Sequence, residues 1–308
     1  MHHVKVGITL GGGVGPGDGA VQAETLGFDS VWVGEHITNW GAGTMSAIPM
    51  LATMAAATSK ITVGTSILLF PLRHPTMVAK EIATIDILSG GRVVMGIGVG
   101  GENPKEFEAC GINVKERGAR TNEGLDLVIK LWTQDTVSHH GRFFSMEGIS
   151  MAPRPVQQPH PPIYVAGRRD AAMRRAARYG DGWFPYLYDP ERYQQSMATI
   201  QEAAQARKRD LSHFDWAIYQ FIAVENTYEA AHKVAAQALK AMYRQDFETI
   251  APRYAVLGTP NQCLERLRQF YEAGARHIVL VPLGDAKGRQ ARLETLAEKV
   301  VPEVRKFQ

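Results

Sequence analysis

The sequence predicts one closed (β/α)8 barrel, an α/β fold, over residues 1–308, with an insertion at residues 133–161. Three observations predict this fold class. Helical segments repeatedly end at glycine and lead directly into short apolar segments. These segments are continuously apolar, as in strands that a parallel sheet buries on both faces. Eight such strands, each followed by helical sequence, favour a closed barrel over an open, doubly wound sheet.

Glycine marks the helix ends before four of the strands, because glycine accepts the left-handed backbone that terminates a helix. Gly27, Gly90, Gly180 and Gly274 lead into predicted strands at residues 28–33, 92–97, 181–184 and 275–281, respectively. Runs rich in apolar and β-branched residues predict the other four strands, at residues 4–10, 61–69, 162–166 and 216–224.

Apolar residues at helical spacing predict the helices around the barrel. The pattern is clear at residues 122–132, and it recurs at 192–208, 228–243, 262–273 and 289–306. The insertion at 133–161 lies between the fourth helix and the fifth strand and has no long helix. It contains His139-His140-Gly141-Arg142, which resembles a turn, followed by several prolines, so we expect an excursion that includes a hairpin.

The composition is that of a globular protein with a sizeable core, with 45% apolar and 21% charged residues. The net charge of +3 is too small to indicate a nucleic-acid or membrane partner. We recognise neither a signal peptide nor an apolar run of about 18 residues, and we expect a cytoplasmic protein. Cys110 and Cys263 show no metal-ligand spacing. His139 and His140 are adjacent rather than four positions apart, and the sequence reveals no carboxylate partner for them, so no metal site is predicted.

One motif favours a competing fold. Gly15-Pro16-Gly17-Asp18-Gly19-Ala20 matches the G-x-G-x-x-A fingerprint of dinucleotide-binding domains, and Glu35 follows where the ribose-binding acid would lie. However, the first strand ends near Leu10, too early for the required tight turn, and Pro16 occupies the loop whose N–H groups would face the pyrophosphate. A Rossmann NAD dehydrogenase is therefore the less favoured alternative, and we interpret residues 11–19 as a loop at the barrel mouth.

Functional residues of a barrel gather at the C-terminal ends of its strands. The second strand leads into Glu35 and His36. Imidazole titrates near neutrality, so His36 is the candidate acid–base residue. Glu35 could tune His36 or bind substrate. The structural alternative for His36 is a histidine that only forms hydrogen bonds in the core, and for Glu35 it is a surface acid on a loop.

Two further strands carry candidate residues toward their C-terminal ends. The third strand carries Thr65-Ser66-Ile67 there. Gly98 and Gly100, at the end of the fourth strand, allow a flat ring to approach the backbone, although they also fit close packing. Glu102 and Asn103 follow them directly.

The fifth strand leads into Ala166 and then Gly167-Arg168-Arg169, which is predicted to open a helix. A helix N-terminus beside an arginine suits a phosphate group. The later arginines of that helix, Arg174, Arg175 and Arg178, fit a solvated helix face instead.

Several segments together resemble the luciferase-like monooxygenase superfamily over nearly the whole chain. They are ETLGFDSVW at 24–32 with Glu35-His36, LATMAAATSKITVGTS at 51–66, ATIDILSGGRVVMGIG at 83–98, RGARTNE at 117–123, GRFF at 141–144, PRPVQ at 153–157 and GDGW at 180–183. Each segment is weak alone, whereas their order and spacing are specific.

The resemblance implies a (β/α)8 barrel that binds FMN or the deazaflavin coenzyme F420 at its C-terminal mouth. The segments RGARTNEG, HGRFF and APRPVQ are similar to those of the deazaflavin users. The resemblance implies that His36 lies near the reactive ring carbon, with the acid Glu35 before it. It also implies a non-proline cis peptide near Thr65-Ser66-Ile67 behind the ring, a cofactor phosphate at Gly167 and Arg168, and polar contacts to the ring from Gly100, Glu102 and Asn103.

We therefore expect an oxidoreductase that transfers hydride between F420 and an organic substrate, with His36 as the acid–base or ring-positioning residue. The alternatives are an FMN-dependent luciferase-like monooxygenase supplied by a partner reductase, and a non-catalytic barrel that binds flavin or has lost it. A small-molecule substrate and, by analogy with the family, a homodimer are expected. The glycine-rich loop at 11–19 lacks the longer substrate-contacting segment of many members, so the resemblance names no substrate.

Overall fold

The computed structural model describes residues 3–11, 14–38, 43–243 and 245–308. In these ranges eight parallel strands pair in the order β1–β2–β3–β5–β8–β9–β10–β12, and β12 pairs back with β1. The predicted (β/α)8 barrel is therefore confirmed. Its strands are β1 (Lys5–Thr9), β2 (Ser30–Val33), β3 (Thr62–Thr65), β5 (Val93–Gly98), β8 (Ile163–Val165), β9 (Gly182–Trp183), β10 (Asp215–Val224) and β12 (His277–Pro282).

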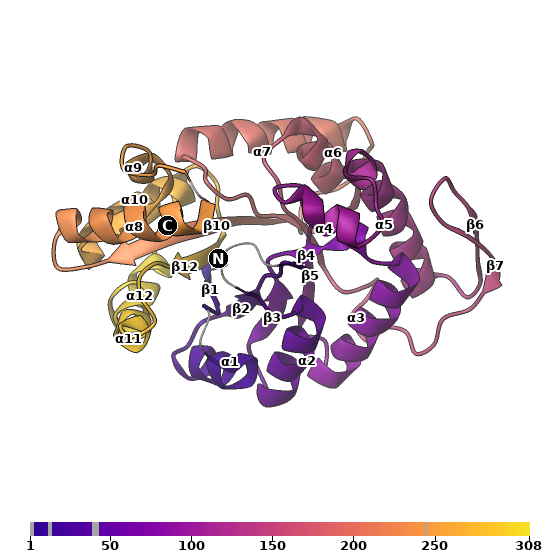
Figure 1. The fold of residues 1–308 in the computed structure, drawn as a ribbon, viewed down its shortest axis with the longest axis horizontal. Coiled ribbons are helices and arrows are strands. Elements are labelled where there is room, and N and C mark those ends of the chain that lie inside the picture. The colour runs from indigo at the N-terminus through magenta and orange to yellow at the C-terminus, as the bar shows by residue number, and fades with distance from the viewer. Residues whose placement is uncertain (1–2, 12–13, 39–42, 244) are drawn as a thin grey trace.

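Helices surround this barrel (Figure 1). They are α1 (Pro16–Thr25), α2 (Ala47–Ala57), α3 (Pro75–Ser89), α5 (Arg117–Thr133), α6 (Asp170–Tyr179), α7 (Pro190–Gln205), α8 (Tyr228–Tyr243), α10 (Pro260–Glu272), α11 (Arg289–Lys299) and α12 (Val301–Val304). Smaller elements interrupt the alternation: β4 (Leu68–Leu69), α4 (Pro104–Ala109), α9 (Ala251–Tyr254), β11 (Val256–Gly258) and two 3-10 turns, η1 (Phe70–Leu72) and η2 (Val114–Glu116). No helix in the described ranges is both long and apolar enough to cross a bilayer.

One predicted helix is divided. The periodicity at 289–306 predicts a single helix, whereas the chain forms α11 and then the short α12. Pro302 lies at the start of α12. Proline lacks the N–H that a continuous helix needs, and its ring clashes with the carbonyl four residues before it, so the helix restarts there.

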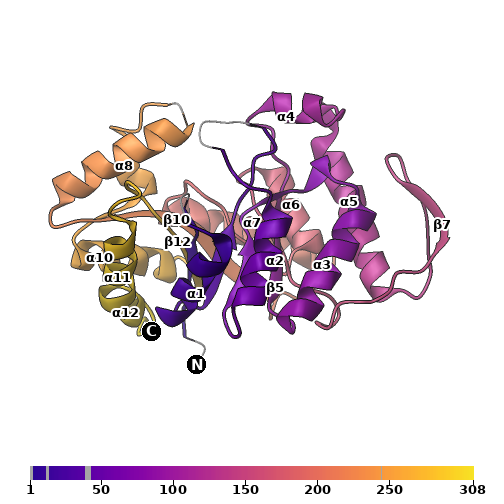
Figure 2. The ribbon, with the colours of Figure 1, turned by 60° about the horizontal axis from the view of Figure 1, so that its bottom comes forward.

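The insertion forms the expected hairpin from β6 (Val137–His140) and β7 (Ser145–Ile149). His139 and His140 belong to β6, so the connection begins at Gly141. Glu123 of α5 accepts hydrogen bonds from the backbone N–H groups of Arg142, Phe143 and Phe144 at 3.1, 2.9 and 2.8 Å. This carboxylate fixes the hairpin to the flank of the barrel, away from α4 (Figures 1 and 2).

Large aromatic side chains fill the barrel interior. Trp32, Tyr164 and Phe184 form a buried layer with three smaller residues, Val94, Ala217 and Val279. On the neighbouring strand β3, Gly64 lies against the indole ring of Trp32. A Cβ at this position would come within 2.4 Å of the ring, so only glycine leaves enough room. This layer is packed like the interior of any folded protein and closes the centre of the barrel.

A polar network closes the N-terminal end of the barrel. The carboxylate of Asp215 accepts hydrogen bonds from Lys5 at 2.9 Å and from the hydroxyl of Tyr164, and it contacts Nδ1 of His277 at 3.3 Å. The other ring nitrogen of His277 lies 2.8 Å from the hydroxyl of Ser30. Burial alone would raise the pKa of Asp215, but His277 and Lys5 reverse that effect and hold this pKa well below its usual range.

Replacing Asp215 with Asn should lower the free energy of unfolding at neutral pH by about 3 kcal/mol, because several side chains lose their buried charged acceptor. The folded-state pKa is depressed, so this stabilisation is present above the unfolded value of about 4 and is lost as the pH falls through the folded value. Urea titrations at pH 7 and at about pH 3 should therefore give a smaller difference between wild type and variant at the lower pH.

Asp135→Asn is the control for this experiment. Asp135 pairs with Arg154, but its side chain is 97% exposed, so its loss should leave the unfolding curve nearly unchanged. An Asp215→Asn variant that unfolds like wild type at both pH values would show that the network does not stabilise the fold.

Candidate active site

The C-terminal ends of the barrel strands, here called the mouth, have an apolar floor. Ile67, Ala166 and Tyr219 pack on the buried layer that contains Trp32, and all three remain partly exposed. Each lies beyond the buried layer in the direction in which its strand runs. Close packing of the barrel therefore ends at these three side chains.

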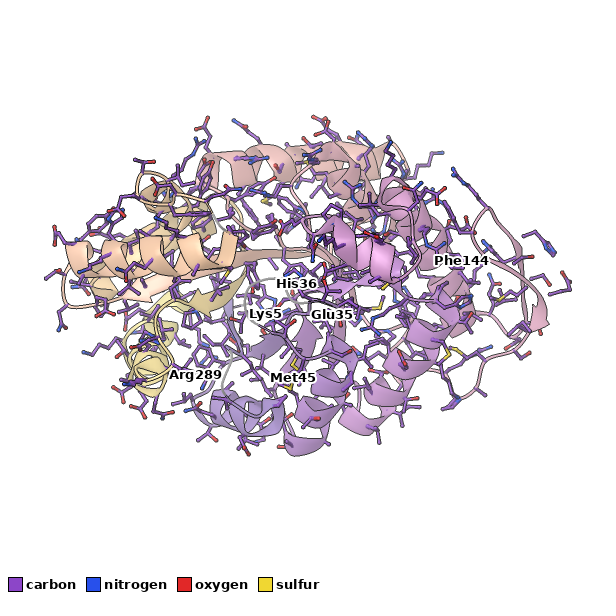
Figure 3. The ribbon with its side chains drawn as sticks, in the orientation of Figure 1. Lys5, Glu35, His36, Met45, Phe144 and Arg289 are labelled. Carbon is purple, nitrogen blue, oxygen red and sulfur yellow. The ribbon has the colours of Figure 1, made fainter. Side chains whose placement is uncertain are left out.

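His36 follows β2 at the mouth, near the middle of the ring of helices in Figure 3. Its Nδ1 lies 3.2 Å from the nearer carboxylate oxygen of Glu106, which belongs to α4. The two side chains are 30% and 2% exposed, respectively. The same carboxylate oxygen accepts the backbone N–H of Ile37 at 2.7 Å and that of Thr38 at 3.4 Å. Glu106 thus fixes both the imidazole and the backbone that follows it.

Glu35 makes a different set of contacts, although it precedes His36 directly. Its carboxylate accepts hydrogen bonds from Arg73 at 2.7 Å, from the backbone N–H of Ala47 at 2.9 Å and from that of Leu69 at 3.1 Å. Its side chain is fully buried. The structure thus places Glu35 between α2, β4 and Arg73, where it joins the supports of the mouth.

Sequence reasoning missed Glu106, the acid that contacts His36. The segment Asn103-Pro104-Lys105-Glu106 carries a usable signal, since Asn before Pro is typical of a helix start. Asn103 does cap α4: its side chain accepts the N–H of Lys105 at 3.3 Å and donates to the hydroxyl of Thr38 at 3.0 Å. The partner of Glu106, 70 positions away along the chain, is set only by the closed barrel.

Of the candidate residues at the ends of β3 and β5, some pack inside the barrel and others lie at the mouth. The cis peptide bond joins Ser66 and Ile67, which confirms the predicted position. The Thr65 hydroxyl instead donates to the carbonyl of Gly96 at 2.7 Å and ties two strands together. A Cβ at Gly98 would lie 2.1 Å from the Ile67 side chain, so this glycine makes room for Ile67.

Gly100 and the loop after it leave the barrel to approach β9. Gly100 has a φ of +60°, and a Cβ there would meet Leu69 at 2.8 Å. Glu102 then accepts a hydrogen bond from the hydroxyl of Tyr186, which follows β9. The strand-four loop thereby links two sides of the mouth.

Gly167 and Arg168 lie at the mouth but outside the helix. Helix α6 begins at Asp170 with Arg169 at its N-cap, so the prediction that Gly167 opens the helix is wrong by a few residues. Gly167 adopts a φ of +125°, and the Arg168 guanidinium lies 4.7 Å above the ring of Tyr186. Arg178 pairs instead with Asp126 at 3.1 Å on the flank of the barrel.

The glycine-rich loop does not form a dinucleotide site. Gly15 is the N-cap of α1, and the rest of the fingerprint lies inside that helix, where Gly17 packs closely on Thr53 and Ala57 of α2. Gly12 and Gly13 lie outside the described residues. Within the described ranges, no group of three or more His, Cys, Asp or Glu side chains is arranged to hold a metal ion.

Comparison with known proteins agrees with this architecture. The family model for luciferase-like monooxygenases matches residues 17–277. An F420-dependent glucose-6-phosphate dehydrogenase of Amycolatopsis mediterranei is 29% identical over 318 aligned positions, which cover 93% of each chain.

Two solved structures share the fold. The monooxygenase RslO1 of Streptomyces bottropensis superposes with a TM-score of 0.82 at 26% identity, over 97% of this chain and 99% of that one. An F420-dependent secondary alcohol dehydrogenase, solved with an F420-acetone adduct, gives a TM-score of 0.83 at 22% identity over 99% of both chains. The motifs of the sequence, the closed barrel and the family match lead to one assignment: the chain belongs to the luciferase-like monooxygenase family.

Proposed function

We propose that this chain transfers a hydride between the deazaflavin F420 and an alcohol or carbonyl compound, while His36 exchanges the accompanying proton. The observation that carries the proposal is the contact between His36 and the buried Glu106 beside an apolar floor. Relatives whose names specify F420-dependent dehydrogenases support this choice of cofactor and reaction.

The residues of the mouth fit a deazaflavin by their chemistry. Ile67, Ala166 and Tyr219 offer an apolar surface to a planar ring. The Ser66 hydroxyl is buried and, within the described ranges, has no hydrogen-bond partner, so it suits a polar atom of the ring. The Arg168 guanidinium lies 4.7 Å from the centre of the Tyr186 ring, and its N–H groups suit an anionic phosphate. When bound, the deazaflavin supplies a ring carbon that exchanges hydride.

His36 handles the proton in this proposal. Glu106 engages Nδ1, so Nε2 is the nitrogen that meets the substrate oxygen. His36 takes the hydroxyl proton as an alcohol is oxidised and returns a proton as a carbonyl is reduced. Glu106 holds the ring in one orientation, as a buried carboxylate does for a catalytic histidine. Glu35 does not contact the substrate in this proposal and acts as a positioning residue that supports the loop after β2.

The purified protein should bind oxidised F420 at least about tenfold more tightly than FMN, a difference of about 1.4 kcal/mol. The similarity of residues 117–124 to deazaflavin users and the position of Arg168 are the reasons. Parallel fluorescence titrations measure both dissociation constants. Equal or tighter binding of FMN would favour the FMN-dependent monooxygenase instead and leave the barrel unaffected.

Arg168→Ala should weaken F420 binding by about tenfold or more, because a charge-assisted hydrogen bond to phosphate contributes roughly 1.5–3 kcal/mol. Arg178→Ala is the matched control, since Arg178 pairs with Asp126 on the flank and should not affect the cofactor. The same titration serves both variants. Equal losses would mean that the two arginines act only as a diffuse positive charge.

His36→Asn should lower kcat by roughly 10²–10⁴-fold, the usual contribution of a positioned acid–base group, and leave cofactor affinity within a few-fold. Glu106→Ala should lower kcat more than Glu106→Gln, because glutamine still provides an oxygen for Nδ1. Steady-state F420 reduction measures kcat, and fluorescence measures binding.

Glu108→Ala controls for the helix, because Glu108 is exposed on α4 two positions from Glu106. A purely structural His36 would give another pattern: a lower melting temperature, with normal turnover in the remaining folded protein. That result would remove His36 from the chemistry.

A further inference from the structure

A cluster of four aromatic residues, here called the aromatic wall, lies on one side of the mouth. Tyr219 and Phe221 come from β10, Tyr186 follows β9, and Tyr243 ends α8 (Tyr228–Tyr243). The rings of Tyr186 and Tyr243 are stacked, with centroids 6.2 Å apart and planes at 12°. Phe221 meets Tyr243 edge-on at 6.1 Å and Tyr219 at 5.8 Å. The wall therefore continues the apolar floor upward from Tyr219.

Helix α8 brings Tyr243 to this place because β10 is longer than its barrel neighbours. The face of β10 that carries Tyr219 inside the barrel carries Phe221 and Ala223 further along, where α8 covers them with Ala235 and Leu239. In Figure 2, α8 and α4 lie above the strand ends on opposite sides of the mouth. The wall thus stands across the mouth from the helix that carries Glu106.

The wall is joined to the acid–base pair through one loop. Glu102 accepts the hydroxyl hydrogen of Tyr186, and four positions later Glu106 contacts His36. Tyr186, Tyr219 and Tyr243 all remain partly exposed. A substrate whose oxygen meets His36 therefore has aromatic side chains available for the rest of its body.

The four aromatic side chains of the wall are uncharged, and the cation beside them, Arg168, is assigned above to the phosphate of the cofactor. Burial raises the pKa of Tyr219 to about 12, and it raises the pKa of both Tyr186 and Tyr243 further above the ordinary range. All three phenols are protonated at neutral pH. Aromatic ring faces carry negative charge density, which favours apolar groups over a phosphate dianion.

We propose that the aromatic wall binds the hydrocarbon body of the substrate, and that the enzyme acts on a secondary alcohol or ketone with such a body in preference to a phosphorylated sugar. This inference rests on the proposed function. In the oxidation, the C–H bond of the carbinol carbon breaks, and its hydrogen is transferred together with both bonding electrons to the oxidised deazaflavin. The hydroxyl proton passes to His36, and the C–O bond becomes C=O. Two electrons leave the alcohol and two enter the cofactor.

The first experiment compares F420 reduction by cyclohexanol, 2-propanol and glucose 6-phosphate. Each buried CH₂ group adds a favourable transfer free energy, so kcat/KM should be at least about tenfold higher for cyclohexanol than for 2-propanol. It should be higher for either alcohol than for glucose 6-phosphate. Efficient turnover of glucose 6-phosphate with inert cyclohexanol would overturn this inference and leave F420-dependent hydride transfer intact.

The second experiment removes the wall. Tyr243→Ala should raise the KM for cyclohexanol by about tenfold, with kcat changed by less than about threefold, because a binding surface is lost and the acid–base pair is not. Tyr243→Phe keeps the ring and should restore the wild-type KM. Tyr228→Ala is the matched control, since Tyr228 lies at the other end of α8, stacked on His232. Equal KM values in all four proteins would overturn the role of the wall.

Binding without turnover separates this inference from the proposed function. 1-Methylcyclohexanol has the hydroxyl and the hydrocarbon body but no carbinol hydrogen, so it cannot lose hydride. Calorimetry with the F420-loaded protein should show binding that Tyr243→Ala weakens by about tenfold and Tyr228→Ala leaves unchanged. Such binding supports the wall even if no alcohol is oxidised, a result that would count against the proposed reaction alone. Absence of binding to wild type would overturn the inference, and failure to bind F420 would overturn both.

Discussion

The carboxylate of Glu106 lies against the ring of His36 and under the backbone of Ile37 and Thr38. A buried carboxylate is costly unless several donors satisfy it, so these contacts act as one unit. The loop that precedes it adds Asn103, which binds Thr38, and Glu102, which binds Tyr186. One short segment after β5 therefore organises the chain after β2 and the chain after β9. That segment therefore connects three of the loops that form the mouth.

Residues that stabilise the fold and residues proposed to act in the reaction lie at different heights along the barrel axis. Asp215 and its partners lie at the N-terminal end, and the layer of Trp32, Tyr164 and Phe184 closes the centre. Above that layer, the side chains become partly exposed, and the buried hydroxyl of Ser66 has no hydrogen-bond partner among the described residues. Unpaired polar groups weaken a fold, and a protein keeps them where a ligand completes them. The buried layer beneath the mouth allows this without loss of the barrel.

The sequence was sufficient for the eight barrel strands and the hairpin, because periodicity and glycine placement determine local structure. The resemblance to the family supplied the cis peptide at Ser66–Ile67. The short strands β4 and β11 were not predicted. It was insufficient for pairings across the barrel. Glu35 and His36 are neighbours in sequence, yet Glu35 binds Arg73 whereas His36 meets Glu106, 70 positions away. Successive residues of an extended chain point to opposite sides, so adjacency in sequence gives no evidence of shared chemistry. The stack of Tyr186 on Tyr243 likewise exists only because the long β10 carries α8 over the mouth.

The two sides of the mouth are held by different helices. His36 is held from α4, whereas Tyr243 is placed by α8 and by the apolar cluster around Phe221 and Leu239. The hydrogen bond between Glu102 and Tyr186 is the direct link between the two sides. A barrel built in this way can alter the substrate body that it accepts while it keeps the same proton exchange, because the two requirements fall on different loops.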